Sequence, residues 1–100
     1  MNLLDLPTVK YRSRLEIIST ILRTAMEGAT KTKIMYMSYL SYEQSKEYLQ
    51  FLQERGLLEY KSEEEVYRIT EKAIRFLKTA QEMNEILPSR DLNDDIDHLR

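Results

Sequence analysis

Apolar residues recur at three- and four-residue spacing in four stretches of the chain, which is the pattern of amphipathic helices. The stretches cover residues 12–27, 30–37, 41–55 and 71–87. Thr30, Ser41 and Thr70 stand immediately before three of them, and each can cap the free amides of a first turn. In the short second helix the spacing directs Ile34 and Met37 toward the interior.

The third helix has the clearest start and stop signals. Ser41 and Gln44 can form a capping box, and Gly56 can adopt the left-handed conformation just past the last turn. The face spaced for burial carries Ser45, Tyr48, Leu49 and Leu52. The opposite face carries Tyr42, Glu43, Lys46, Glu47 and Gln50. Such a helix is either an ordinary surface helix or the element that reads a partner.

Two short stretches between the third and fourth helices read as strands. Residues 57–61 and 66–69 contain alternating apolar and aromatic positions, and the polar residues 62–65 connect them. This pattern predicts a β-hairpin that must pack on the helices, because a two-stranded hairpin is marginally stable alone.

The last helix has more apolar residues than one buried face needs. Ala73, Phe76, Ala80, Met83 and Leu87 repeat at the spacing of a coiled coil. The stripe either packs within the monomer or forms a dimer seam. We expect a homodimer, because a chain of 100 residues offers little else to cover Met83 and Leu87. The predicted seam consists of Phe76, Ala80, Met83 and Leu87.

The order of these elements is that of a winged helix-turn-helix, in which residues 38–40 are the turn, the third helix is the recognition helix and the hairpin is the wing. The predicted fold is mainly α with a small β-hairpin. We expect an N-terminal segment (1–11), a winged helix-turn-helix domain (12–70), a C-terminal dimerisation helix (71–87) and an acidic tail (88–100).

Charge is distributed unevenly along the chain. The net charge of −2 speaks against nucleic acid, yet residues 1–40 hold six Lys/Arg against three acidic residues, while residues 62–100 hold ten acidic residues against six Lys/Arg. An acidic C-terminal third can therefore hide a basic surface elsewhere. The absence of cysteine and of any long apolar run indicates a cytoplasmic protein without a membrane span.

Enzyme chemistry is the poorest interpretation of this sequence. The single histidine, His98, lies in the tail with no cysteine beside it for a metal site. Gly28 and Gly56 are the only glycines, so no glycine-rich phosphate loop is present. We expect no catalytic residue, no cofactor and no small-molecule ligand.

The string TKIMYMSYLSYEQSKEYLQFLQERGLLEY, followed by VYRITEKAIRFL, resembles the archaeal winged helix-turn-helix transcriptional regulator family. The matching positions are Thr32, Ile34, Met35, Tyr36, Leu40, Ser41, Tyr48, Leu49, Leu52, Gly56, Leu57, Tyr67, Ile69, Thr70 and Lys72. The resemblance covers about residues 12–80. It implies DNA binding and often dimerisation through the C-terminal helix, as in small archaeal chromatin-type proteins.

This chain departs from the family pattern at two places. Ala73 stands where the family usually has glycine, which suggests different packing at the start of the last helix. The wing tip is Ser62-Glu63-Glu64-Glu65, and these carboxylates would be repelled by phosphates. Either this wing stays off DNA or the protein binds something else.

Eight residues are the candidates for contact with double-stranded DNA. Base edges would face Tyr42, Glu43, Lys46 and Gln50, since Lys46 can donate to guanine, Gln50 can pair with adenine and Glu43 can accept from cytosine. Phosphates would be held by Lys31 and Lys33, with Arg12 or Arg14. The competing interpretations are solvated surface charges and a protein-protein interaction module, which the acidic wing and tail also fit.

Overall fold

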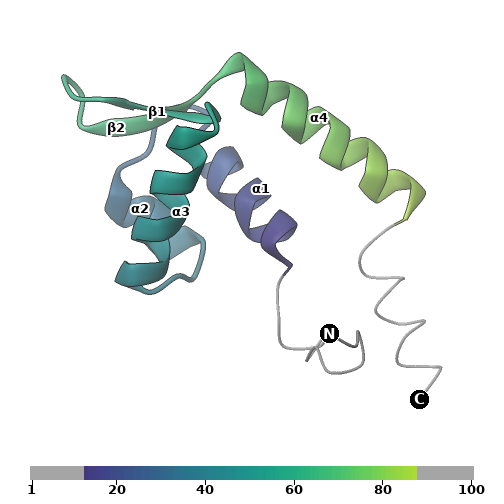
Figure 1. Ribbon diagram of the computed structural model, residues 1–100, viewed down its shortest axis with the longest axis horizontal. Helices are drawn as coiled ribbons and strands as arrows, with labels where there is room; N and C mark the ends of the chain where they lie inside the picture. Colours follow the sequence, from purple (N-terminus) through teal and green to yellow (C-terminus); the bar gives the residue numbers. More distant parts are fainter. Residues whose placement is uncertain (1–12, 88–100) are drawn as a thin grey trace.

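The computed structural model describes residues 13–87, which form four helices and one two-stranded sheet (Figure 1). In chain order the elements are α1 (Arg14–Thr24), α2 (Lys31–Met37), α3 (Tyr42–Glu54), β1 (Leu58–Lys61), β2 (Val66–Ile69) and α4 (Glu71–Ile86). Every predicted element is present in the predicted order, with ends that differ by a few residues. The predicted N-terminal segment (1–11) and acidic tail (88–100) lie outside the described residues.

Short-range hydrogen bonds set the start of every helix. The side chains of Ser13, Thr30, Ser41 and Thr70 each accept a hydrogen bond from the amide three residues later. At α3 the Gln44 side chain also accepts from the Ser41 amide, which completes the predicted capping box. These caps depend on neighbouring residues alone, which is why the sequence locates the helix starts well.

The hydrophobic core lies where α1, α2 and α3 meet the hairpin and the first turn of α4. Its buried members are Ile21, Leu22, Ala25, Ala29, Ile34, Leu49, Leu52, Leu57, Leu58 and Ala73. Met37, which the spacing directs toward the interior, is instead on the surface, with 53% of its area exposed. At the end of α2 the inward position belongs to Ser38, which is fully buried four residues after Ile34.

The hairpin is antiparallel and pairs Leu58 with Ile69 and Lys61 with Val66. A further residue joins it from the α1–α2 connection, because Ala29 and Tyr67 exchange backbone hydrogen bonds of 2.9 and 2.8 Å. The sequence pattern did not predict this bridge. The bridge connects the segment just before α2 to strand β2 of the wing.

Gly28 makes that bridge possible. Its φ of +96° lies in the region that favours glycine, and a Cβ atom there would meet the Arg68 side chain at 3.2 Å. The Gly28 amide also bonds to the Ala25 carbonyl as α1 ends. The glycine therefore turns the chain from α1 into the Ala29–Tyr67 pair.

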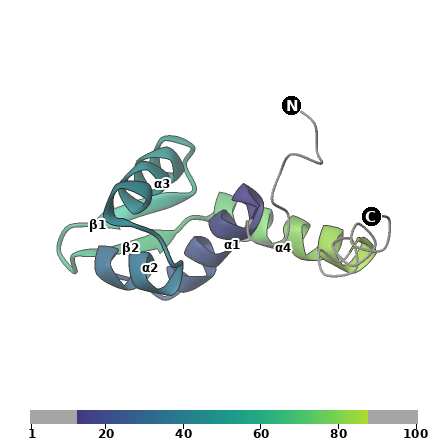
Figure 2. The same cartoon turned by 90° about the horizontal axis from the view of Figure 1, so that it is seen from below.

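The two halves of α4 have different surroundings. Ala73 is fully buried and Phe76 and Leu77 pack against the core, whereas Met83, Ile86 and Leu87 are 55%, 78% and 67% exposed. Both views show the C-terminal end of α4 leading away from the other helices (Figures 1 and 2). Within residues 13–87 no helix is long and apolar enough to span a bilayer.

Candidate nucleic-acid interface

The turn between α2 and α3 is closed by backbone hydrogen bonds. The Leu40 amide bonds to the Met35 carbonyl at 3.0 Å, and the Tyr39 amide bonds to the Tyr36 carbonyl at 3.2 Å. This is the Schellman arrangement, which needs a left-handed residue after the helix. Tyr39 occupies that position with φ 53° and a side chain that is 84% exposed. The tight turn brings the first turns of α2 and α3 together.

The polar face of α3 points away from the core. Ser45, Leu49 and Leu52 are buried against the other helices, as predicted. The exposed face therefore consists of Tyr42, Glu43, Lys46, Glu47 and Gln50. With two carboxylates and one ammonium, this face is not basic by itself.

Lysines from two helices lie near one tyrosine of this face, Tyr42. The Lys31 Nζ atom, from the first turn of α2, donates a 3.3 Å hydrogen bond to Tyr42 Oη and lies 4.4 Å from the ring centroid. The Lys46 Nζ atom lies 6.0 Å from the same centroid. The structure thus brings together three of the predicted residues, from two parts of the sequence.

The other residues of α2 and α3 that were predicted to contact DNA are exposed. Lys33 and Glu43 lie in the first turns of α2 and α3, respectively. Gln50 donates its side-chain amide to the Glu54 carboxylate at 3.0 Å, one turn further along α3. An adenine contact by Gln50 would have to replace this hydrogen bond.

Arg14 does not join the lysines. Its guanidinium carbon lies 5.9 Å from the ring centroids of both Tyr48 and Phe51, at the side of α3 that faces the start of α1. These distances are close to the outer limit of a cation–π contact, so the guanidinium group interacts weakly with the two rings. Arg14 is exposed beside α3, so its contact with a phosphate stays a prediction, and Arg12, its predicted alternative, lies outside the described residues.

The wing carries its acidic residues at the tip, where β1 turns into β2. Glu64 is paired with Arg68 at 3.1 Å, and Glu59 is paired with Lys61 at 2.9 Å. Glu63 and Glu65 are exposed and form no ion pair with residues 13–87. The tip is therefore only partly neutralised, and its charge opposes contact with phosphates.

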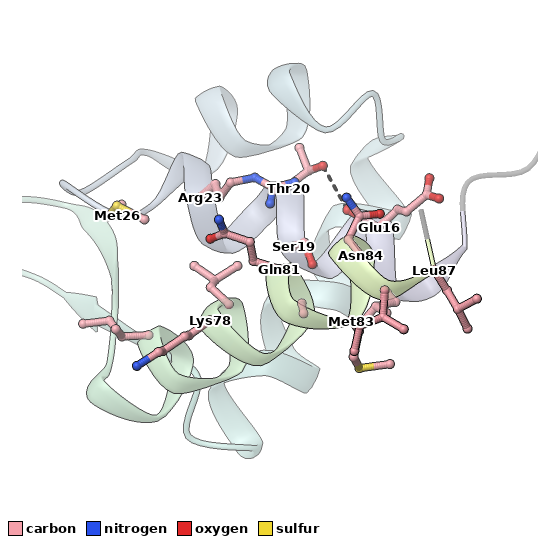
Figure 3. Close-up of a pocket in the computed structure, with 15 residues that line it drawn as sticks. Glu16, Ser19, Thr20, Arg23, Met26, Lys78, Gln81, Met83, Asn84 and Leu87 are labelled. Carbon is pink, nitrogen blue, oxygen red and sulfur yellow. Dashed lines mark hydrogen bonds between the residues drawn. The ribbon is translucent and has the colours of Figure 1, made fainter. Parts of the chain in front are cut away.

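A second feature lies between α1 and α4, where an open groove of about 1030 Å³ runs along the two helices (Figure 3). Its apolar lining comes from Leu15, Met26, Ile74, Leu77, Ala80, Met83, Ile86 and Leu87. Of the predicted seam, Ala80, Met83 and Leu87 line this groove, whereas Phe76 packs against the core. Across residues 13–87 no group of three or more metal-ligating side chains occurs.

Comparisons with known proteins agree with this arrangement. A family model described as a winged helix-turn-helix matches residues 11–87. The structure is similar to that of Sso10a-2, a DNA-binding protein from Sulfolobus solfataricus, with a TM-score of 0.70 and 27% identity over 88% of this chain and 96% of that chain. A comparison with curated proteins gave no match.

Proposed function

The chain belongs to the winged helix-turn-helix family, and we propose that it binds duplex DNA as a homodimer and regulates transcription. The observation that carries this proposal is that Lys31 of α2 lies close to Tyr42 and Lys46 on the exposed face of α3. It supplies positive charge at the end of the helix that enters the major groove in this fold. The similarity to a DNA-binding protein supports the same function.

The two helices have different roles in this proposal. Lys31 and Lys33 on α2 contact phosphates and fix the position of the protein on the duplex. Lys46 donates to guanine, Glu43 accepts from cytosine, and Gln50 pairs with adenine after leaving Glu54. Because the α3 face carries two carboxylates, each protomer binds DNA with moderate affinity and depends on a second protomer.

The C-terminal half of α4 is the surface on which we place the second protomer. Met83, Ile86 and Leu87 are more than half exposed here, as is Ile74 in the first turn of the same helix, an unusual density of large apolar side chains for a monomer surface. A second α4 packed along this side would cover them and the groove beside α1. A two-fold dimer would then bind a palindromic site with half-sites about one helical turn apart.

The paired variants Lys31→Ala and Lys46→Ala test these roles, with binding measured across a selection from random duplex DNA. Lys31→Ala should weaken all bound sequences alike, because phosphates carry no sequence information. Lys46→Ala should instead flatten the preference at one base position by about 1–3 kcal/mol. Lys46 is exposed, Lys31 is half-buried, and neither belongs to the hydrophobic core, so neither change should unfold the protein.

The same experiment distinguishes DNA binding from the alternative function, that of a protein-interaction module. The partly neutralised acidic wing favours it. If the wild-type protein recovers no duplex fragments at low salt, DNA binding is refuted and the interaction module becomes the better account. Equal loss of sequence preference in the two variants would contradict the division of roles between α2 and α3.

A further inference from the structure

Tyr42 makes contacts that differ from those of a base-reading residue. Its hydroxyl oxygen accepts the Lys31 hydrogen bond, and its ring faces the Lys31 ammonium group at 4.4 Å. Lys46, at 6.0 Å, lies at the outer limit of a cation–π contact. The ring therefore interacts closely with the phosphate candidate on α2 and only weakly with the base-reading candidate on its own helix.

We propose that Tyr42 is a positioning residue, which holds the Lys31 side chain ready for a backbone phosphate and does not itself read a base. The inference rests on the proposed function, because the phosphate is that of duplex DNA. Lys46 remains free to turn toward a base edge. The α2–α3 contact thereby links the phosphate-binding lysine to the recognition helix.

The chemistry of the partner explains why a tyrosine suits this position. Lysine loses much side-chain freedom when it is fixed on a ligand, and holding it in place beforehand lowers that cost. A carboxylate could also hold Lys31, but it would neutralise the charge that attracts the phosphate. An aromatic ring holds the ammonium group and leaves its charge in place. Within the described part of the chain, Lys31 forms no ion pair.

Variants at Tyr42 and Lys31 separate positioning from direct contact, with affinity for a mixed-sequence duplex measured by fluorescence anisotropy over a range of salt. Tyr42→Leu should weaken binding about fivefold per protomer and reduce the salt slope toward that of Lys31→Ala. Tyr42→Phe keeps the ring and should restore most of the affinity. Tyr36→Leu, at another exposed tyrosine, is the matched control and should bind as the wild type does.

The double variant gives the decisive comparison. In the Lys31→Ala background, Tyr42→Leu should cause almost no further loss, because the lysine that it positions is gone. An additional loss as large as in the wild-type background would mean that Tyr42 contacts DNA directly and would overturn the proposal. Unchanged affinity and salt slope in Tyr42→Leu alone would overturn it as well.

A measurement on the free protein keeps this inference separate from the proposed function. In the NMR spectrum, the ring should shift the ε-methylene protons of Lys31 upfield, and Tyr42→Leu should abolish the shift. An unshifted Lys31 in the wild type would overturn the positioning role even if DNA binds. Failure of the wild type to bind any duplex would refute the proposed function instead, whatever the spectrum shows.

Discussion

The α2–α3 surface and the C-terminal half of α4 are both exposed, but they differ in chemistry. The first presents Lys31 and Lys46 beside the Tyr42 ring, and Lys33 in the first turn of α2, with acidic residues interspersed. The second presents Met83, Ile86 and Leu87, each more than half exposed. A polar, charged surface remains stable in water, whereas an apolar one favours a partner of the same kind. In the proposed function, the first surface binds the DNA polyanion and the second forms the contact between protomers.

The largest expected effect is a loss of stability on substitution of Phe76, which lies between the core and the exposed C-terminal half of α4. Phe76→Glu should lower the free energy of unfolding by about 3 kcal/mol, because Phe76 packs against the core and a carboxylate there would be desolvated. Urea denaturation followed by circular dichroism measures this. Wild-type stability would show that Phe76 belongs to the exposed half of α4 instead.

Met83→Glu should produce monomers with a nearly unchanged helical fold. Met83 is 55% exposed, so the change removes little packing within the protomer, but it places a charge in the proposed seam. Light scattering gives the mass, and affinity for a palindromic duplex should fall about a hundredfold with the loss of the second half-site. Glu85→Lys, at an exposed position on the opposite side of α4 from Met83 that does not line the groove, is the control and should stay dimeric.

Substitutions in the acidic wing should have a smaller effect on DNA affinity, and they test whether the DNA-binding surface extends to the wing. Replacing both Glu63 and Glu65 by glutamine should raise affinity for mixed duplex DNA about fivefold at low salt and less at high salt. Anisotropy titrations at two salt concentrations measure the change. Identical affinities for the variant and the wild type would show that the wing lies away from the phosphates.

The smallest effect concerns the turn that joins α2 to α3. Tyr39→Gly should stabilise the protein by about 0.5 kcal/mol, since a left-handed tyrosine is strained where glycine is not. Gly56 holds the corresponding position after α3, with φ +72°, so Gly56→Ala should destabilise the protein by a similar amount. Thermal melts compare the two, and destabilisation by Tyr39→Gly would reveal a stabilising role for the tyrosine side chain.

Much of the fold follows from sequence because its signals are local. Helix caps at Thr30, Ser41 and Thr70 need only residues within one turn, and the structure confirms all three. The hairpin likewise has its strands at the predicted places. Its link to Ala29 escaped prediction because one bridging residue leaves no periodic pattern.

The candidate site was less predictable because it depends on how helices pack. Lys31 and Tyr42 are eleven positions apart, and only the closed turn between α2 and α3 brings them within 3.3 Å. Arg14 was grouped with the DNA contacts by its charge, and the sequence did not predict that its guanidinium carbon lies 5.9 Å from the Tyr48 and Phe51 ring centroids. Met37 fits the helical period of α2, but the adjoining buried position is filled by Ser38.

The central claim, that the lysine-bearing surface of this winged helix binds duplex DNA, is tested most directly by the salt dependence of binding. The dissociation constant of the wild-type protein for a mixed-sequence duplex is measured from 50 to 200 mM salt, the range over which phosphate contacts lose affinity steeply. If Lys31 and Lys33 of both protomers neutralise about four phosphates, log K should fall against log salt with a slope of about −3.6. No detectable binding at the lowest salt, or a slope near zero, would contradict the account.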